Sequence, residues 1–401
     1  MSARQVESIG VVGAGTMGTG IALLASLGGY RTSIYDPDAA ALAAAPSMIT
    51  AGLVKGAGKR WSAEDVEHAE ALLATADSIE AMAGCDLVIE AAPESVELKR
   101  RLFAELADAC GPEAILATNT SSLRVAEIAA ETPRPERVVG MHFFNPPALM
   151  KLVEVVATEV ADKGALEATT EVARRMGRTP ILARDSPGFI ANRLARPFSL
   201  ESLRMLAEGV APVETIDRVC RLGGGFRMGP FELLDLIGLD VNLSVARSFY
   251  EQGGEPERWR PSPIQEEMVA AGRLVRKSGE GFYRYDGDRH REVDPELGVE
   301  APTLDEQELL RIDPAAPQIL PRLLAQIANE AAFALEEEVG SPEDMNTAMR
   351  LGFNWPLGPI EFTEMLGRER AAALLEALSK EHGEAYRPAP RLEASPKREA
   401  E

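Results

Sequence analysis

The stretch that decides the fold is GVVGAGTMGTGIALLASLGGYRTSIYD, which runs from Gly10 to Asp36. An apolar run leads into Gly13, Gly15 and Gly18, and a segment with helical composition follows directly. A second β-rich run, RTSIYD, then ends on an acid. Strand, glycine turn, helix and strand in this order predict a βαβ unit whose two strands are parallel.

Each glycine has a predicted physical role in this turn. Gly13 permits a tight bend, Gly15 lets a pyrophosphate approach the backbone, and Gly18 lets the helix pack closely on the strand. Asp36 follows the last glycine by 18 residues. A carboxylate there accepts hydrogen bonds from both ribose hydroxyls and repels a 2′-phosphate, which predicts NAD as the cofactor. An ordinary glycine-rich turn is the alternative, and the complete context disfavours it.

The same alternation continues through the first half of the chain. Further strands are predicted at DLVIEAA, AILATN, RVVGMHF and KLVEVV, with helical stretches between several of them. This pattern indicates a mostly parallel sheet covered by helices on both faces. From Asp185 onward the pattern is amphipathic helix almost throughout. We therefore expect an α/β Rossmann-type nucleotide-binding domain followed by all-α domains.

The helical half repeats itself. VETIDRVCRLGGGFRMGPFELLDLIGLD from Val213 resembles PEDMNTAMRLGFNWPLGPIEFTEMLGRE from Pro342, and Arg221 and Arg350 give the offset, 350 − 221 = 129 residues. Chance similarity of two Leu-rich helix pairs is the alternative, but the matched Gly-Phe and Gly-Pro pairs favour a tandem helical repeat. The predicted domains are 1–184 (nucleotide-binding), 185–285 and 318–384 (helical), with a linker at 286–317 and a disordered tail at 385–401.

Composition excludes several classes of function. The net charge of −21 argues against a nucleic-acid or membrane-surface role, since both need positive potential. No apolar run approaches the roughly 20 residues that span a bilayer, and the N-terminus lacks a signal-peptide segment, so a cytoplasmic protein is expected. The three cysteines show no paired spacing, which predicts neither disulfides nor a metal site.

One of the four histidines stands out. His142 ends a predicted buried strand in VVGMHFFNPP, and in parallel sheets ligands meet the carboxyl ends of strands. The other three, in polar surroundings, are expected at the surface: His68, His290 and His382. A lone core histidine is often only hydrogen-bonded filler. However, Pro146 and Pro147 fix the turn behind His142, and Glu154 lies in the next strand, where an antiparallel or looped return brings it to the ring.

A carboxylate on one imidazole nitrogen orients the ring and stabilises its charged form. The other nitrogen can then act as a general base. Glu154 would otherwise be an unusual acid inside an apolar strand, KLVEVV. The two residues together predict a catalytic pair.

Taken together, the motifs resemble the L-3-hydroxyacyl-CoA dehydrogenase family. The resemblance covers nearly the whole chain and is carried by GAGTMG, ATNTSSL, GMHFFNPPALMKLVEVV, DSPGFIANR and KSGEGFYRYD. The family pairs a histidine base with a glutamate, and His142 and Glu154 match in identity and spacing. Ser121 matches a serine that hydrogen-bonds the substrate's 3-oxygen, and Asn192 matches an asparagine near the histidine and the substrate.

The resemblance also implies contacts with the cofactor and with CoA. Besides the glycines and Asp36, the residues that match NAD contacts are Thr16, Met17, Glu94, Lys99, Asn145 and Lys277. Lys59, in the basic island VKGAGKRW, matches a lysine that faces the acyl-CoA, with a solvated loop as the alternative. At Gly52 the chain departs from the pattern, because some members have a serine that touches CoA there.

The resemblance implies NAD-dependent oxidation of (3S)-3-hydroxyacyl-CoA to 3-oxoacyl-CoA. Related dehydrogenases with a catalytic lysine rank low, because Asn192 occupies that region and no lysine lies near it. A non-CoA substrate such as carnitine or a sugar acid stays open, as does an idle NAD-binding scaffold. The pathway also stays open among fatty-acid β-oxidation, butanoate or storage-polymer metabolism and aromatic degradation.

The repeat carries an expectation about assembly. Short members of the family have one helical unit and pair through it as dimers. Here the second copy is expected to take the partner's place within one chain. This internal pseudo-dimer predicts either a monomer or a homodimer of another kind.

Overall fold

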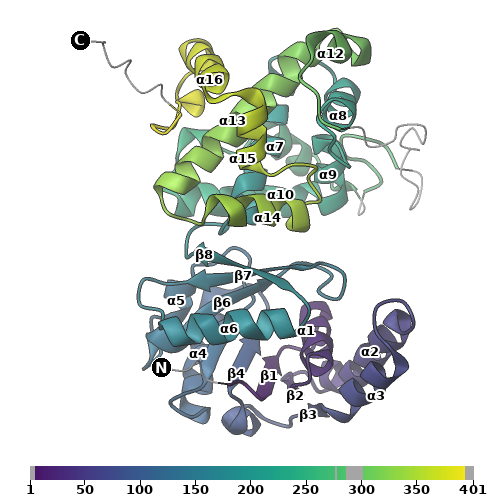
Figure 1. Cartoon of the computed structure of the whole chain (residues 1–401), viewed down its shortest axis with the longest axis vertical. Coiled ribbons are helices and arrows are strands. Elements are labelled where there is room, and N and C mark those ends of the chain that lie inside the picture. The colour runs from purple at the N-terminus through teal and green to yellow at the C-terminus, as the bar shows by residue number, and fades with distance from the viewer. Residues whose placement is uncertain (1–4, 276–277, 286–300, 393–401) are drawn as a thin grey trace. The chain divides into compact units, whose positions relative to one another are not determined.

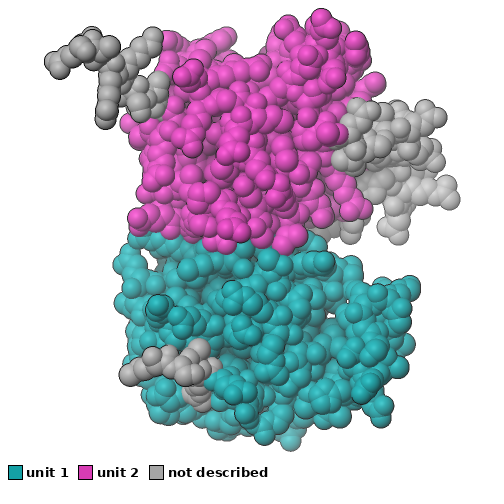
Figure 2. All heavy atoms as spheres, viewed as in Figure 1, with its two compact units in different colours: residues 1–189 teal, residues 190–401 magenta. Residues whose placement is uncertain are grey.

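The computed structural model describes residues 5–275, 278–285 and 301–392. The chain forms two compact units, Met1–Phe189 and Ile190–Glu401 (Figure 2). The first unit carries the sheet and the second is helical (Figure 1). The predicted α/β and helical halves are thereby confirmed, and the first unit ends at Phe189, whereas the predicted boundary lay at residue 184.

The first unit is built on an eight-stranded sheet in the order β3-β2-β1-β4-β5-β6-β7-β8. The strands are β1 Ser8–Val12, β2 Arg31–Tyr35, β3 Leu73–Thr75, β4 Leu87–Glu90, β5 Ile115–Thr118, β6 Val138–Phe143, β7 Leu152–Ala157 and β8 Thr179–Arg184. The first six are parallel, β7 runs antiparallel to β6, and β8 is parallel to β7. This is the expected Rossmann-type sheet, to which the structure adds the edge strands β3 and β8.

Helices cover both faces of the sheet. They are α1 Thr16–Leu27, α2 Ala39–Gly56, α3 Ala63–Ala71, α4 Val96–Ala109, α5 Val125–Ala129 and α6 Lys163–Arg175, with the short η1 Ile79–Gly84 and η2 Pro135–Arg137. Helix α6 lies across β6, β7 and β8 (Figure 1). One core cluster joins Val11 of β1 and Val153 of β7 to Ile21 of α1 and Val172 of α6. Burial of these apolar side chains holds the sheet against the two helices.

Helix α2 is apolar along most of its length. It is a candidate membrane span by length and composition alone, and 22% of it is buried. Ala45, Ile49 and Leu53, four residues apart, are fully or almost fully buried in the core of the first unit. This one-sided pattern is that of a helix packed along one face.

The second unit contains the two helical copies. The first has α7 Ala191–Ala207, α8 Val213–Leu222, α9 Pro230–Ile237, α10 Leu239–Gln252, η3 Glu257–Trp259 and α11 Pro263–Ala270. After α12 Glu306–Ile312, the second has α13 Ala316–Glu336, α14 Pro342–Gly352, α15 Pro359–Leu366, α16 Arg368–His382 and η5 Glu384–Tyr386. Helices α8, α9 and α10 recur as α14, α15 and α16, each beginning 129 residues later (342 − 213 = 129). The tandem helical repeat therefore has matching helices as well as matching motifs.

Two predicted irregular segments need correction. Part of the predicted linker at 286–317 is ordered, because α12 and the start of α13 fall within it, while residues 286–300 lie outside the described residues. In the predicted disordered tail, Tyr386, Ala389 and Leu392 are buried. Asn329 of α13 accepts a hydrogen bond from the Ala389 amide at 2.7 Å, which satisfies the backbone there. Disorder was thus the wrong expectation for residues 385–392, and residues 393–401 lie outside the described part.

Buried ion pairs join the two copies. Arg193 of α7 donates to Glu330 of α13 at 2.7 Å and to Glu337, directly after α13, at 2.6 Å. The Arg193 side chain is fully buried and that of Glu330 is 3% exposed. Trp259 donates its indole N–H to the second oxygen of Glu330 at 2.9 Å. Each charge therefore has a partner inside the interface.

The same arrangement recurs with the copies exchanged. Arg322 of α13 binds Glu201 of α7 and Glu208, directly after α7. Tyr386 donates its hydroxyl to Glu201 at 3.1 Å. The residues of the two arrangements correspond at the offset of the repeat. Arg193 corresponds to Arg322 (322 − 193 = 129), Glu201 to Glu330 and Glu208 to Glu337. In an interface with two-fold symmetry, residue i contacts j and residue j contacts i. The two copies meet in that way within one chain.

We predict that Arg193→Met lowers the free energy of unfolding of the helical unit by about 3 kcal/mol, because it leaves the buried Glu330 carboxylate without its main partner. Urea denaturation followed by circular dichroism measures this. Arg247→Met is the matched control, since Arg247 pairs with Glu266 at the surface and its loss should cost less than about 0.5 kcal/mol. Equal losses in the two variants would contradict the predicted role of the buried pairs.

Candidate active site

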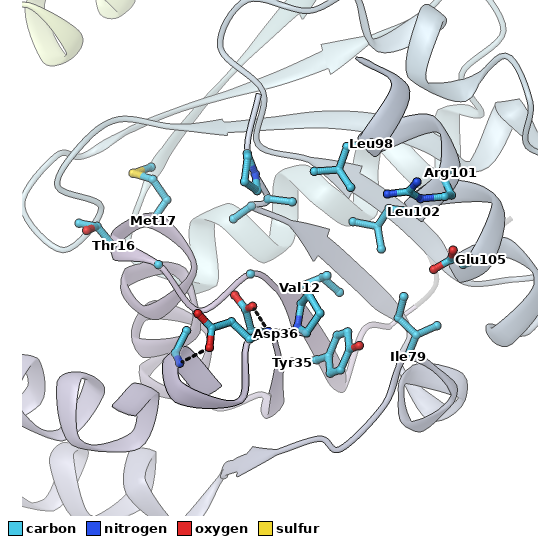
Figure 3. Close-up of a pocket in the computed structure, with 18 residues that line it drawn as sticks. Val12, Thr16, Met17, Tyr35, Asp36, Ile79, Leu98, Arg101, Leu102 and Glu105 are labelled. Carbon is cyan, nitrogen blue, oxygen red and sulfur yellow. Dashed lines mark hydrogen bonds between the residues drawn. The ribbon is translucent and has the colours of Figure 1, made fainter. Parts of the chain in front are cut away.

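A cavity of roughly 730 Å³ opens beside the glycine turn in the first unit (Figure 3). It lies at the ends of β1 and β4, where the strand order reverses and where doubly wound sheets bind dinucleotides. Its wall from η1 and α4 is mainly apolar and includes Ile79, Leu98 and Leu102, together with Arg101 and Glu105. An apolar wall opposite polar groups suits an adenine ring and its ribose.

The glycine turn borders this cavity. Gly13 has a φ of +110°, and a Cβ there would lie 2.5 Å from the Ala91 carbonyl oxygen. A Cβ on Gly18 would lie 1.7 Å from the Gly13 oxygen, so the helix could not approach the strand. A Cβ on Gly15 would meet nothing within 4 Å. Gly15 is the N-cap residue of α1, and no side chain accepts a hydrogen bond from the first N–H groups of this helix. The next two residues, Thr16 and Met17, line the cavity. This uncapped helix end therefore fits a pyrophosphate.

Asp36 is held in place at the edge of the cavity (Figure 3). One carboxylate oxygen accepts a hydrogen bond from the Ala14 amide at 2.7 Å, and the other accepts from the Asp38 amide at 2.8 Å. The first of these bonds ties the end of β2 to the glycine turn. A fixed carboxylate at this position can receive ribose hydroxyls, whereas a 2′-phosphate would be repelled.

His142 and Glu154 face each other across β6 and β7. The antiparallel register pairs the two residues directly, and Nδ1 of His142 lies 2.7 Å from a carboxylate oxygen of Glu154. His142 is 6% exposed and Glu154 is fully buried. With Nδ1 directed at the carboxylate, the Nε2 atom is the nitrogen left to exchange a proton with a ligand. The structure thus brings together the pair that the sequence singled out.

Aromatic side chains surround the imidazole. The ring centroid of His142 lies 4.6 Å from that of Phe144 and 5.9 Å from that of Phe189. Phe189 adopts a positive φ of 52°. Asn119, at the end of β5, accepts a hydrogen bond from the Phe143 amide at 2.8 Å. Sequence reasoning missed Asn119, although its place inside the ATNTSSL motif was a usable signal.

A buried lysine organises the loop after β4. Lys99 of α4 is 1% exposed, and its ammonium lies 2.6 Å from Glu90 and 3.4 Å from Glu94. Glu90, at the end of β4, also accepts from the Thr118 hydroxyl at 2.6 Å. Lys99 was predicted as a cofactor contact, and here its charge is directed at the two acids. Glu90 was not singled out, although an acid that ends an apolar strand, DLVIE, was a signal of the same kind as Glu154.

Glu94 connects this lysine to the turn that contains Ser121. Burial opposes ionisation of Glu94, but the Lys99 ammonium and hydrogen bonds from Thr120, Ser122 and the Ser121 amide outweigh it, so the pKa of Glu94 is lowered. The Thr120 hydroxyl donates at 2.6 Å and the Ser121 amide at 3.2 Å. Glu94 is therefore a charged anchor for the serine turn. Since β5 and β6 are neighbouring parallel strands, this turn and His142 share the carboxyl edge of the sheet.

Two further predicted contacts, Asn145 and Lys59, are exposed. Asn145 is exposed and precedes a cis peptide bond to Pro146. Lys59 is exposed in the turn after α2, and its neighbour Arg60 donates to the Ala148 carbonyl at 3.0 Å, in the loop behind His142. A Cβ on Gly52 would lie 2.6 Å from Leu23, which gives glycine a packing reason at that position.

Two predicted site residues belong to other parts of the chain. Asn192 lies in the second unit, in the first turn of α7, and its approach to His142 stays a prediction. Lys277 lies outside the described residues.

Comparison with known proteins decides the family. The model for the NAD binding domain of 3-hydroxyacyl-CoA dehydrogenase matches residues 8–186. The model for the C-terminal domain of the same enzyme matches at residues 188–285 and 319–397. The chain belongs to the 3-hydroxyacyl-CoA dehydrogenase family. The second range matched by the C-terminal domain model, residues 319–397, falls on the second helical copy, as expected for a tandem repeat.

Individual relatives agree. The chain is 37% identical to the 3-hydroxyadipyl-CoA dehydrogenase of Escherichia coli K12, over 96% of each protein. It is 40% identical to the 3-hydroxybutyryl-CoA dehydrogenase of Bradyrhizobium diazoefficiens, over 71% of this chain and 97% of the relative. The crystal structure of 3-hydroxybutyryl-CoA dehydrogenase from Escherichia coli K12 superposes with a TM-score of 0.87 at 36% identity, covering 97% of this chain and 98% of that one.

As a member of this family, the chain is an NAD-dependent oxidoreductase. The predicted cofactor is thereby confirmed, and the open space at Gly15, the fixed Asp36 carboxylate and the apolar cavity wall fit it. NAD supplies the hydride acceptor when it is bound. The protein's part is to bind, align and exchange a proton.

We predict that Asp36→Ser shifts cofactor preference toward NADPH, because it removes the negative charge that meets a 2′-phosphate. The ratio of kcat/KM for NADPH to that for NADH should rise about 10-fold or more, measured with acetoacetyl-CoA as substrate. Glu105→Gln, on the opposite wall of the cavity, is the control and should leave this ratio unchanged. An unchanged ratio in Asp36→Ser would show that another group selects the cofactor.

Proposed function

We propose that His142 is the general base of the family reaction, the oxidation of a (3S)-3-hydroxyacyl-CoA to the 3-oxoacyl-CoA, and that Glu154 orients it. The observation that carries this is the 2.7 Å contact between Nδ1 of His142 and the buried Glu154 carboxylate. The contact fixes the ring and leaves Nε2 to take the 3-hydroxyl proton. The carboxylate then stabilises the imidazolium that forms.

The surroundings of the histidine support this role. Phe144 and Phe189 exclude water from the imidazole, which strengthens every charge interaction made there. Ser121, on the turn anchored by Glu94, would position the 3-oxygen, and Asn192 would contact the substrate as well. Glu90 and Lys99 would hold this turn and the loop beside the nicotinamide. Lys59 would face the CoA phosphates.

CoA thioesters are the substrates we favour. The relatives reported above are named for 3-hydroxyadipyl-CoA and 3-hydroxybutyryl-CoA, so six-carbon dicarboxylic and four-carbon acyl chains are the first to test. Carnitine or a sugar acid ranks below them, and so does an idle scaffold, because the chain keeps the complete His142–Glu154 pair. A cytoplasmic location stays a prediction.

His142→Ala should lower kcat for acetoacetyl-CoA reduction by at least about 100-fold, since a positioned acid–base group contributes that much or more. NADH absorbance reports turnover, and NADH fluorescence reports cofactor affinity, which should stay within about 2-fold because the cofactor cavity is intact. His68→Ala, on the exposed helix α3, is the control and should behave like the unchanged protein. Near-normal turnover by His142→Ala would exclude it as the base.

We also propose that the two helical copies form an internal pseudo-dimer and that the chain is a monomer. The reciprocal ion pairs of Arg193 and Arg322 support this. Aromatic contacts add to them, because Phe226 of the first copy lies 5.3 Å from Trp355 and 5.4 Å from Phe362 of the second, measured between ring centroids. The first copy thus has its apolar face covered by the second.

Deletion of residues 316–401 should expose Phe226 and leave Arg193 without Glu330 and Glu337. We predict that the truncated chain dimerises or aggregates, because an apolar patch of this kind is unstable in water. Light scattering coupled to size-exclusion chromatography measures the mass of both chains. A truncated chain that stays monomeric with an unchanged melting temperature would overturn the pseudo-dimer proposal.

A further inference from the structure

Helix α7 carries a buried cation that has no acidic partner among the described residues. Arg196 is 8% exposed, and its guanidinium carbon lies 5.3 Å from the centroid of the Phe249 ring on α10. Its Nε atom is buried and has no hydrogen-bond partner in the described ranges, and no carboxylate there forms an ion pair with it. Burial lowers the pKa of Arg196 to about 10, so the side chain is still charged at neutral pH.

Such an arrangement is costly for a folded protein. A buried charge without a counter-charge loses its hydration, and contact with one aromatic ring restores only part of that loss. The neighbouring buried arginines of this unit do not bear the same cost. Arg193 and Arg322 each bind two carboxylates. Arg196 therefore needs an explanation other than interface stability.

The second helical copy provides an internal comparison. At the offset of 129 residues, Arg193 is retained as Arg322, together with both of its acidic partners. Asn192, by contrast, corresponds to Pro321, and Arg196 corresponds to Ala325, which is fully buried. The copy thus retains the residues that join the two halves and lacks Asn192 and Arg196. Asn192 is the predicted substrate contact. Arg196, like Asn192, is present in the first copy and absent from the second, which is the pattern we expect of a residue that serves the substrate site.

Helix geometry places Arg196 with Asn192. Residues four apart lie on the same face of a helix, one turn from each other, with an axial rise of about 6 Å. In a six-carbon acyl chain, three carbon–carbon bonds of about 1.5 Å each join C3 to the terminal carbon. An acyl chain with C3 at Asn192 therefore brings its far end within reach of a long side chain one turn further along α7.

We propose that Arg196 binds the distal carboxylate of a dicarboxylic 3-hydroxyacyl-CoA, a thioester whose acyl chain ends in a second carboxylate. This inference rests on the proposed function, in which Asn192 contacts the substrate. A planar guanidinium presents two parallel N–H donors to a carboxylate, and the substrate then supplies the counter-charge that the described part of the chain does not offer. Arg196 is accordingly a specificity-determining residue, and an acyl chain with a methyl end leaves its charge unpaired.

The test compares two substrates of equal length, 3-hydroxyadipyl-CoA and 3-hydroxyhexanoyl-CoA, which differ only at the far end of the acyl chain. The unchanged protein should have the higher kcat/KM for 3-hydroxyadipyl-CoA. Arg196→Met should lower the ratio of the two kcat/KM values by about 100-fold, because it removes one partner of a buried charge pair. Arg196→Lys, which keeps the charge but not the two-pronged geometry, should give an intermediate ratio.

Controls separate binding from folding. Arg247→Met makes the same change on the surface of α10, two residues from Phe249, and should leave the ratio unchanged. The melting temperature of Arg196→Met should be equal to or higher than that of the unchanged protein, since an unpaired buried charge is lost. A structural role for Arg196 would instead lower the melting temperature and reduce turnover of both substrates alike.

The outcomes also distinguish this inference from the proposed function. Turnover of 3-hydroxyhexanoyl-CoA without preference for 3-hydroxyadipyl-CoA would overturn the role of Arg196 and leave the proposed function intact. A ratio that does not change in Arg196→Met would do the same. If the unchanged protein oxidises neither thioester, the proposed function fails and this inference fails with it.

Discussion

His142 and Glu154 face each other because β7 runs antiparallel to β6, against the direction of the six strands before it. Side chains alternate along a strand, so a slip of one residue in this register would turn Glu154 to the opposite face of the sheet. The parallel strands supply the glycine turn and the carboxyl edge where a dinucleotide binds. The reversed strand then brings a carboxylate to the histidine at that edge. The cofactor site thus depends on the parallel strands, and the contact between His142 and Glu154 depends on the one change of strand direction.

In the first unit, the groups that attract negative charge lie directly beside the anions that they bind. The chain carries a net charge of −21, yet its cofactor is an anion. The glycine turn meets this with an uncapped helix end, whose N–H groups attract phosphate without adding a formal charge. Close by, Lys99 is enclosed between Glu90 and Glu94, so a single buried cation holds two acids and the serine turn. A few oriented groups at a site shielded from water therefore attract the cofactor more strongly than the acidic side chains of the surface repel it.

The second unit shows how duplication separates stability from function. Arg193 and Arg322, with their glutamates, are equivalent in the two copies because the contact between the copies needs both sides. Asn192 and Arg196 occur in one copy only, where Pro321 and Ala325 of the other are free to serve packing alone. In the proposed function one copy supplies residues toward the substrate, while its duplicate covers the aromatic face around Phe226.

The sequence by itself determined the glycine turn, the parallel sheet, the helical repeat and the residues of the His142–Glu154 pair, because each of these follows from local periodicity or short spacing. Only the tertiary structure decided the partners of buried charges. Glu90 meets Thr118 across 28 residues and Arg193 meets Glu330 across 137, and no local pattern encodes such distances. Tertiary contacts also decided three other features. They are the short edge strand β3, the packing of the segment around Tyr386, and the burial of Arg196 with no acidic partner among the described residues. Burial and pairing are properties of contacts between distant segments, and a charge becomes costly or useful only once those contacts remove its water.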